Sequence, residues 1–495
     1  MENNMKRSSG ILMHISSLPS KYGIGTFGEE AYRFVDFLKK SGQRYWQILP
    51  LGQTGYGDSP YQCFSAFAGN PYFIDFDLLK NQGFLKESDY NSEFFGENKN
   101  LVDYGTLFIA KNKVLRKAYE NSKGKLEREI YQFSEGNKEW LDDYALYMSV
   151  KKHFNLKSWT TWDKDIRLRK IEAIEKYKNE LKDEINYWKF IQYIFFNQWS
   201  RLKKYANNLG IKIIGDIPIY VAEDSADLWS NPQYFKVDDN MLPTKVSGCP
   251  PDLFSETGQL WGNPIYNWSL MEKENYKWWI KRVRESLNMY DVIRIDHFRG
   301  FESYWEVPYG NDTAINGSWV KGPGIKLFDE IKKELGEVSI IAEDLGFLTE
   351  EVIEFRNKTG FPGMKVLQFA FGGGNSYLPH NYEKNCVVYT GTHDNDTIYG
   401  WYNNTASEQE VESAKKYLAL SYDEGISIGF IRGAFSSVAD LAITTMQDFL
   451  GLGSEARMNL PATLGDNWKW RVKKEDLTDE LAEKIYQLTM RYERI

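Results

Sequence analysis

The chain has 495 residues, and its 61 lysines and arginines against 69 aspartates and glutamates give a net charge of −8. An acidic chain without a dense basic block argues against nucleic-acid binding, and no apolar run reaches the roughly 18 residues of a membrane span. Aromatic residues make up 16% of the chain whereas histidine occurs five times. This balance favours stacking against ring-shaped ligands over metal chelation.

The N-terminus and the cysteines bear on the cellular compartment in which the protein is expected. The first ten residues carry two basic side chains but no long apolar stretch follows them, so they resemble neither a signal peptide nor a transit peptide. Cys63, Cys249 and Cys386 lie far apart and fit no zinc or redox motif. Few, scattered cysteines are typical of a reducing cytosol, so we expect a cytoplasmic protein.

Eight short apolar runs along the chain are rich in β-branched or aromatic residues, as buried parallel strands are. They lie at residues 11–14, 45–50, 211–216, 292–296, 338–343, 364–371, 386–393 and 441–445. Helical patterns separate most of them, at residues 27–41, 278–288, 325–335 and 407–420. Eight strand–helix units with polar residues at the strand ends predict an α/β fold, a single (β/α)₈ TIM barrel spanning residues 1–495.

Two long excursions interrupt this alternation. Residues 53–210, between the second and third strands, hold Lys/Glu-rich stretches with helical apolar spacing at 107–121, 139–153 and 171–204. We interpret them as an inserted, mostly helical subdomain on the face that carries the C-terminal ends of the strands. Residues 222–276, rich in Pro, Gly, Asn and Trp, are interpreted as a structured loop over the active site and not as a helix.

A G-x-S-x-G match at residues 425–429 suggests a serine nucleophile elbow but fails on context. The elbow needs a preceding strand and a histidine later in the chain. The segment before Ser427 is helical in pattern, and the last histidine is His393. We therefore interpret the match as chance, at the start of a helix.

Three candidate strand ends carry acids: RIDHFRG at 294–300, AEDLG at 342–346 and GTHDND at 391–396. Side chains alternate along a strand, so Arg294 and Asp296 share a side, and the guanidinium is expected to lower the pKa of Asp296 and keep it ionised. Glu343, at the end of an apolar run, is expected to have a raised pKa and to donate a proton.

One ionised carboxylate and one proton-donating carboxyl group are the two groups that retaining glycoside cleavage uses. One carboxylate attacks the anomeric carbon, and a second carboxyl group about 5 Å away protonates the leaving oxygen and then activates the acceptor. Asp394 could hold a distorted sugar ring, with His393 donating a hydrogen bond beside it. Taken singly, each of these residues is more often structural, since Asp at the end of a strand is commonly a helix N-cap. The cluster at 393–396 leaves a metal site as a rival, although few histidines lie near the strand ends.

With these motifs in view, the sequence resembles the 4-α-glucanotransferases (amylomaltases or disproportionating enzymes) of glycoside hydrolase family 77. The resemblance runs in order from about residue 8 to 471. Besides the three acid-bearing segments, it rests on GYGDSPYQ at 55–62, GDIPIYV at 215–221, PPDLFS at 250–255, GQLWGNP at 258–264 and RMNLP at 457–461.

The resemblance implies that Asp296 is the nucleophile, Glu343 the acid/base and Asp394 the transition-state stabiliser. It also implies substrate-binding residues. Those expected around the cleaved sugar are Arg294, His393, Asp216 and Tyr61, and those expected in the loop on the acceptor side are Asp252, Trp261 and Asn263. Ser59 and Tyr56 are also expected to bind substrate. No metal or organic cofactor is expected.

The implied reaction cuts an α-1,4 bond in a maltooligosaccharide, amylose or a similar glucan and passes the glucan to the 4-hydroxyl of glucose or another glucan. A stacked sugar acceptor excludes water and arrives oriented, which can offset water's roughly 55 M concentration. Three alternatives remain: an α-glucan hydrolase with the same carboxylates, a non-catalytic glucan-binding protein, and a metal hydrolase.

Overall fold

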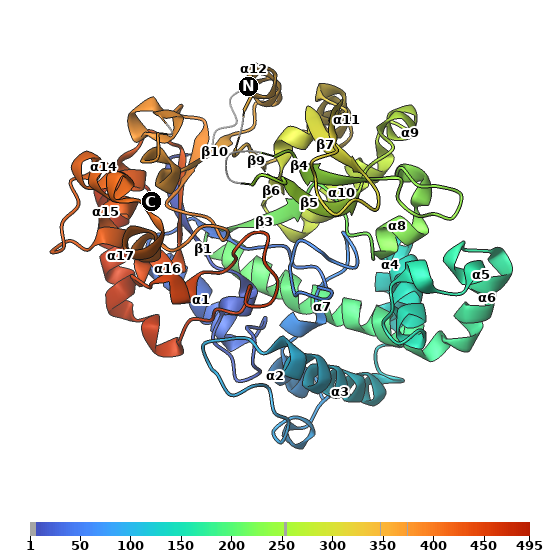
Figure 1. Cartoon of the computed structure of the whole chain (residues 1–495). Coiled ribbons are helices and arrows are strands. Elements are labelled where there is room, and N and C mark those ends of the chain that lie inside the picture. The colour runs from blue at the N-terminus through green and yellow to red at the C-terminus, as the bar shows by residue number, and fades with distance from the viewer. Residues whose placement is uncertain (1–5, 252–254, 347, 374) are drawn as a thin grey trace.

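A parallel β-barrel forms the centre of the computed structural model, which describes residues 6–251, 255–346, 348–373 and 375–495 (Figure 1). Its strands are β1 (Ser8–Leu12), β2 (Tyr45–Gln47), β3 (Lys212–Pro218), β6 (Val292–Asp296), β9 (Ile340–Ala342), β10 (Gly363–Val366), β11 (Cys386–Tyr389) and β12 (Leu441–Thr445). They pair in the order β10-β11-β12-β1-β2-β3-β6-β9, and each recorded pairing is parallel.

The two ends of this order meet beside each other. The backbone N–H of Ala342, the last residue of β9, donates to the carbonyl of Pro362, which precedes β10, at 2.9 Å. Strands β1, β11 and β12 are buried along their whole length, as expected for a barrel with helices outside. The predicted (β/α)₈ barrel with helical insertions is therefore confirmed.

Helices surround the strands. They are α1 (Glu29–Lys40), α10 (Lys277–Met289), α11 (Ile325–Leu335), α12 (Glu350–Thr359), α13 (Ile398–Gly400), α14 (Glu408–Leu418), α15 (Ile426–Ser436), α16 (Met446–Phe449) and α17 (Asp479–Arg491). In α1, Phe34, Val35 and Leu38 form the buried side, while acidic residues open the helix and lysines end it, as the helix dipole favours. The G-x-S-x-G match begins α15, as predicted.

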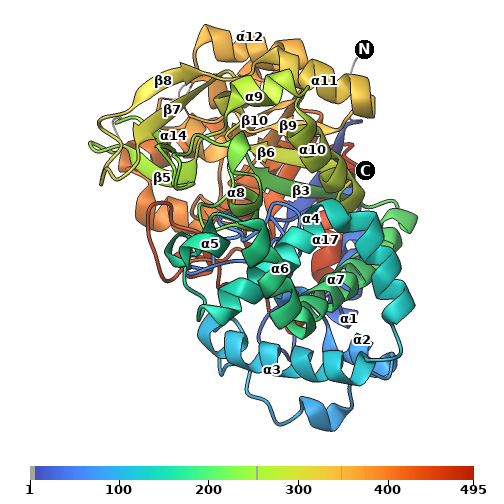
Figure 2. The same ribbon diagram turned by 90° about the vertical axis from the view of Figure 1, so that its right-hand side faces the viewer.

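The chain between β2 and β3 forms a helical region beside the barrel, and Figure 2 shows it below the strands. It contains α2 (Phe76–Asn81), α3 (Tyr104–Ser122), α4 (Glu127–His153), α5 (Lys164–Arg167), α6 (Ile171–Glu180) and α7 (Lys182–Asn208). Helix α7 packs on α4 within this region and on α1 of the barrel, so it joins the two parts. The boundaries of a subdomain at 53–210 stay a prediction.

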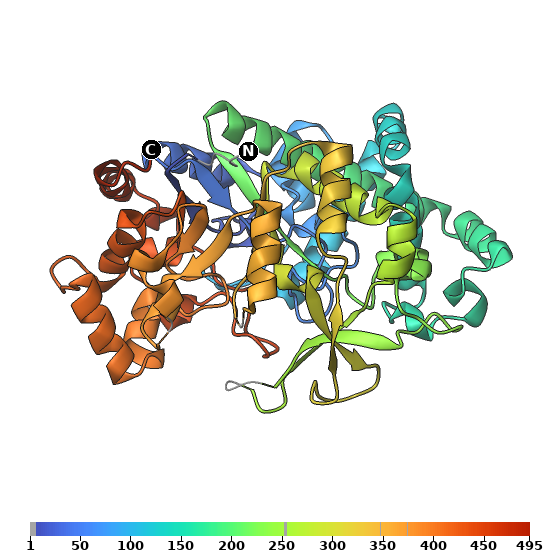
Figure 3. The same ribbon diagram turned by 90° about the horizontal axis from the view of Figure 1, so that it is seen from above.

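A second, antiparallel sheet projects from the barrel (Figure 3). Its order is β5-β4-β7-β8, with β4 (Lys245–Cys249), β5 (Gln259–Pro264), β7 (Ser303–Pro308) and β8 (Ser318–Lys321). Residues 222–276, predicted as a loop without helix, thus contribute β4, β5 and the short helices α8 (Ala226–Ser230) and α9 (Trp268–Lys273). These elements are too short, and too interrupted by Gly and Pro, to show a period in the sequence.

Buried Arg494 fastens the C-terminus of the chain to the N-terminal side of the barrel. Its guanidinium donates to the carbonyls of Ser8 at 3.0 Å and Phe435 at 2.8 Å, and the N–H of Ser9 donates to the Arg494 carbonyl at 3.1 Å. Within the described part of the chain, no helix combines the length and the apolar character that a membrane crossing requires.

Candidate active site

The predicted acidic and basic residues gather at the C-terminal mouth of the barrel. Asp216 lies in β3, Arg294 and Asp296 in the adjacent β6, and Glu343 directly after β9, the next strand in the barrel. Asp394 follows β11. Because parallel strands present their C-terminal ends on one face, side chains from four strands meet there.

Arg294 joins two of these acids. Its Nη1 donates to both carboxylate oxygens of Asp216, at 2.8 and 2.7 Å, and its Nη2 lies 3.0 Å from Oδ1 of Asp296. Asp216 is fully buried and also accepts a hydrogen bond from the Tyr61 hydroxyl at 3.0 Å. Buried Asp216 therefore fixes the positions of both the Arg294 guanidinium and the Tyr61 hydroxyl.

The backbone of β3 contributes to this close fit. A Cβ atom added to Gly215 would lie 2.2 Å from the ring of Tyr290, so only glycine fits beside that ring. Burial of an Asp–Arg pair is costly unless the geometry is good and the remaining polar atoms are bonded. The bonds of Arg294 to Asp216 and Asp296, together with the bond of Tyr61 to Asp216, meet that requirement for the pair.

Asp296 departs from the expectation for its pKa. Burial raises the pKa of Asp296, Arg294 opposes this rise, and the nearby carboxylates of Asp216 and Asp394 add to it. The sequence-based expectation that Arg294 would lower the pKa overall is wrong, because burial at the barrel mouth outweighs the guanidinium. The side chain is 32% exposed, so its carboxylate remains partly open to solvent at the barrel mouth.

Glu343 has the raised pKa expected of a proton donor. Burial, together with the charge of Asp296, raises the pKa of Glu343 to about 8. Its two oxygens accept hydrogen bonds from the backbone N–H groups of His297 at 2.7 Å and Leu345 at 2.8 Å. At neutral pH Glu343 therefore holds a proton, in a fixed orientation beside the Arg294-paired Asp296.

Asp394 lies between His393 and a segment from the C-terminal part of the chain. Nε2 of His393 is 3.3 Å from Oδ1 of Asp394, and Nδ2 of Asn459 donates to the same oxygen at 2.7 Å. The rings of Tyr61 and His393 stack with centroids 5.1 Å apart and an interplanar angle of 16°. Trp468 packs against both rings.

Two predicted residues of the second sheet have different surroundings. Trp261 in β5 meets the His297 ring edge to face, with centroids 4.7 Å apart, and so reaches the residue that follows Asp296. Asn263 is buried, and its Nδ2 donates to the Val221 carbonyl at 2.9 Å and to Oε1 of Gln62 at 3.3 Å. Asn263 thus ties β5 to the chain beyond β3.

The remaining predicted residues are less engaged. Ser59 forms a turn in which its Oγ accepts the N–H of Tyr61 at 3.3 Å. Tyr56 is fully exposed on its loop, and the structure does not bring it to the carboxylates. Asp252 lies outside the described residues.

The sequence pattern indicates no role for Asn459 or Trp468. Arg457 and Asn459 belong to a segment that entered through resemblance alone, and Trp468 is one aromatic residue among many. They follow the last barrel strand, and only the folded chain brings them to Asp394, Tyr61 and His393. A strand-end pattern cannot identify them, because they lie on no strand.

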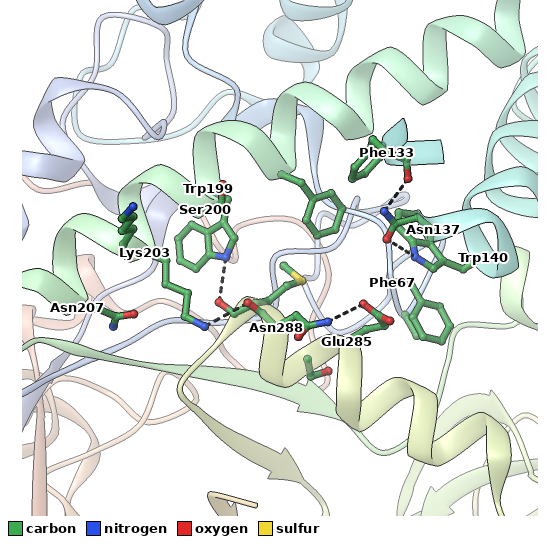
Figure 4. A pocket seen from close by; sticks show the side chains of 15 residues that line it. Phe67, Phe133, Asn137, Trp140, Trp199, Ser200, Lys203, Asn207, Glu285 and Asn288 are labelled. Atoms are coloured by element: carbon green, nitrogen blue, oxygen red, sulfur yellow. Dashed lines mark hydrogen bonds between the residues drawn. The ribbon is translucent and has the colours of Figure 1, made fainter. Parts of the chain in front are cut away.

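A cavity of about 350 Å³ lies apart from the carboxylates, among residues of α4, α7 and α10 (Figure 4). Aromatic side chains including Phe67, Phe133 and Trp140 line it. Two of its polar side chains are bonded within the protein: Asn137 donates to the Phe133 carbonyl and Asn288 to Glu285. As for metals, the part of the chain that is described holds no group of three or more His, Cys, Asp or Glu placed to bind one.

Comparison with known proteins gives full-length similarity. A family model described as 4-alpha-glucanotransferase matches residues 13–478. A 4-alpha-glucanotransferase of Clostridium butyricum is 62% identical over 485 residues (97% of this chain, 100% of the relative), and one of Thermus thermophilus is 47% identical over 504 residues (99% and 100%). The structure of an amylomaltase from Streptococcus agalactiae in complex with acarbose matches with a TM-score of 0.96 at 46% identity, covering 99% of this chain and 100% of that one.

Proposed function

The chain belongs to the 4-alpha-glucanotransferase family, and from this membership we propose that it transfers α-1,4-glucan segments by a retaining double displacement. The donor is a maltooligosaccharide or starch-like glucan, and the acceptor is the 4-hydroxyl of glucose or of another glucan. The observation that carries the mechanism is the pairing of a neutral acid, Glu343, with Asp296 held by Arg294 at one barrel mouth.

In the first displacement, the Asp296 carboxylate attacks the anomeric carbon while Glu343 gives its proton to the leaving glycosidic oxygen. A pKa of about 8 makes Glu343 a competent acid at neutral pH. The donor is cleaved, its non-reducing part becomes bound to Asp296 as an ester, and its reducing part leaves with the proton.

In the second displacement, Glu343 is ionised and accepts the proton of the incoming 4-hydroxyl, whose oxygen attacks the anomeric carbon and releases Asp296. Two inversions at one carbon retain the α configuration. Positive charge develops on the sugar in both transition states, and Asp394, 42% exposed at the same mouth, supplies the opposing negative charge.

The second sheet supports transfer over hydrolysis in this proposal. Trp261 projects from β5 onto His297, next to Asp296 in the chain, and offers an apolar surface for the acceptor. A sugar stacked there arrives oriented and displaces water from the site, so its effective concentration exceeds its bulk concentration.

Incubation with maltotriose tests the proposal. We expect glucose together with a ladder of longer maltooligosaccharides, and almost no net increase in reducing ends. A steady rise in reducing ends would instead identify an α-glucan hydrolase. EDTA is expected to leave the activity on maltotriose unchanged, whereas loss of that activity on adding EDTA would favour the metal hydrolase.

The Asp296→Asn variant tests the assignment of the nucleophile and the non-catalytic alternative together. It is expected to lose disproportionation while still binding maltooligosaccharides, because the amide keeps the shape of the carboxylate but not its nucleophilic charge. Disproportionation at the wild-type rate would contradict the assignment.

A cytoplasmic location is part of the proposal. The small number and wide spacing of the cysteines support a reducing compartment. Fractionation of the source cells, with transferase activity followed in each fraction, checks it.

A further inference from the structure

We propose that Asn459 is a positioning residue that fixes the carboxylate of Asp394 without neutralising its charge. The proposal rests on the role of Asp394 in the proposed function. Asn459 lies beyond the last barrel strand, in a segment that reaches across the barrel mouth to the loop after β11.

The contacts hold one oxygen of Asp394 and leave the other open. Nδ2 of Asn459 donates to Oδ1 at 2.7 Å, and Nε2 of His393 lies 3.3 Å from the same atom. Of the residues that the structure describes, none makes a recorded contact with Oδ2, and the side chain is 42% exposed. The free oxygen is therefore available to a sugar in the cleft.

The backbone around Asn459 is fixed to the backbone around Asp394. Arg457 donates from Nη2 to the Asp394 carbonyl at 2.6 Å and from Nε to the Asn459 carbonyl at 2.8 Å. The N–H of Asn459 donates to the His393 carbonyl at 3.0 Å. These bonds set the spacing between the two segments, so the Asn459 amide meets Oδ1 in one geometry.

The inserted helical region holds this segment from its other side. The N–H of Trp468 donates to the Met458 carbonyl at 2.7 Å, and the hydroxyl of Tyr104, the first residue of α3, donates to the Trp468 carbonyl at 2.8 Å. The N–H of Val102 donates to the carbonyl of Lys469 at 2.8 Å. Asp394 is thus positioned from outside the barrel.

The choice of an amide has a chemical reason. Asp394 helps only if it carries negative charge opposite the cationic sugar, and a lysine or arginine bonded to Oδ1 would cancel that charge. An amide donor bonds to the ionised carboxylate and favours that form, yet adds no charge. Asn459 therefore supplies orientation and leaves the field of Asp394 intact.

Asn459→Ala and Asn459→Asp together test the proposal. In the alanine variant we expect kcat for maltotriose disproportionation to fall by about 10- to 100-fold, the worth of a hydrogen bond to a charged group, with KM changed by less than about 3-fold. In the aspartate variant two carboxylates face each other at hydrogen-bond distance and must share one proton. At low pH, the carboxyl O–H that the substitution introduces at position 459 takes the place of the amide donor.

A pH profile separates positioning from a merely structural role. We expect Asn459→Asp to retain activity within about 10-fold of wild type near pH 5 and to lose it as the shared proton dissociates, at a lower pH than the wild-type decline set by Glu343. This measurement stands even if the alanine variant folds poorly, because it compares one protein with itself.

Asn467→Ala is the matched control. Asn467 accepts the N–H of Leu460 at 2.9 Å through its side-chain oxygen and so orders the same segment, but it makes no recorded contact with Asp394. We expect its kcat to stay within about 2-fold of wild type. A wild-type pH profile in Asn459→Asp, or an unchanged kcat in Asn459→Ala, would overturn the proposed role of Asn459. Failure of the wild-type protein to disproportionate maltotriose would instead overturn the proposed transferase function.

Discussion

At the scale of single residues, the site separates two carboxyl groups by their surroundings. Asp296 faces a guanidinium at 3.0 Å, whereas Glu343 is held by two backbone N–H groups and no cation within bonding distance is recorded for it in the described chain. Burial raises the pKa of both, and the value for Glu343 reaches about 8. With a pKa of about 8, Glu343 holds a proton at neutral pH, which suits the proposed first displacement.

The first prediction concerns the pH dependence of cleavage. Because Glu343 must be protonated to donate, transfer activity is expected to fall as pH rises through about 8, and to hold below that value until Asp296 takes a proton. A profile of kcat/KM against pH with maltotriose measures this decline.

Glu343→Gln provides the control for that prediction. With an α-glucosyl fluoride, whose leaving group needs no proton, the variant is expected to form an intermediate on Asp296 that accumulates and is visible by mass spectrometry. If the descending limb persists in Glu343→Gln acting on the fluoride, another group sets it.

At the scale of elements, the strands that bear the site were predictable and the elements that complete it were not. Runs at 292–296 and 441–445 coincide with β6 and β12, because buried parallel strands are continuous apolar segments. The run at 364–371 ends as a strand at Val366 and continues as a 3-10 turn. Apolar composition alone does not distinguish the two.

The candidate site likewise contains residues that the sequence pattern identifies and residues that it does not. Asp296 ends β6, and Glu343 and Asp394 follow β9 and β11, so all three could be found by position. Asn459 contacts Asp394 through a loop, a pairing that depends on the path of the whole chain. Asn263, which the resemblance places in the acceptor-side loop, bonds through its amide to Val221 and Gln62, and no local pattern could show these partners.

The second prediction belongs to the antiparallel sheet. Trp261→Ala removes the ring that meets His297 and so admits water beside the proposed intermediate. We expect hydrolysis to increase relative to transfer by about 10-fold, because an oriented acceptor no longer displaces water. The ratio of new reducing ends to ladder products from maltotriose measures it.

The control for this substitution is Trp319→Ala. Trp319 is an exposed aromatic residue of β8 in the same sheet, with recorded ring contacts to Trp305 and Arg299 but not to His297. An equal rise in hydrolysis in both variants would attribute the effect to general loosening of the sheet.

The third prediction concerns a lysine that joins α3 to the chain after β2. Lys111 is fully buried, and its Nζ donates to the carbonyls of Tyr72 at 2.6 Å and Ile74 at 3.3 Å. Burial lowers the pKa of Lys111 from 10.5 to about 7, although Asp75 opposes the shift. Between these two values the unfolded chain binds a proton that the folded chain has released.

The free energy of unfolding is therefore expected to rise with pH between about 7 and 10, with a contribution from Lys111 of about 1.4 kcal/mol per pH unit at most. Urea unfolding at several pH values measures this slope. Lys111→Met should flatten it, while Lys117→Met, at an exposed position of α3, should not. Equal slopes in both variants would contradict the assignment.

At the scale of the whole molecule, the ends of the chain close the barrel together. Arg494 is buried, and its guanidinium donates hydrogen bonds to carbonyls of the first strand and of α15. Burial lowers the pKa of Arg494 to about 9, so the side chain is still charged at neutral pH. It links residues at opposite ends of the chain at the far end of the barrel from the carboxylates.

The fourth prediction follows from this link. Arg494→Met leaves several buried carbonyls without donors, each worth about 1–3 kcal/mol, and we expect the free energy of unfolding to fall by about 2–4 kcal/mol. Chemical denaturation measures the loss. The kcat of the folded protein should be unchanged, and Arg491→Ala, at an exposed position, should alter stability by less than about 0.5 kcal/mol.

The antiparallel sheet has one more consequence. Strands β4 and β5 precede β6 in the chain and β7 and β8 follow it, yet β4 pairs with β7. The segment that contains β6, and with it Asp296, is therefore flanked on both sides by strands that pair with each other in the same small sheet. A chimaera that exchanges this sheet between relatives must therefore exchange the whole segment from β4 to β8, and with it Asp296, the proposed nucleophile.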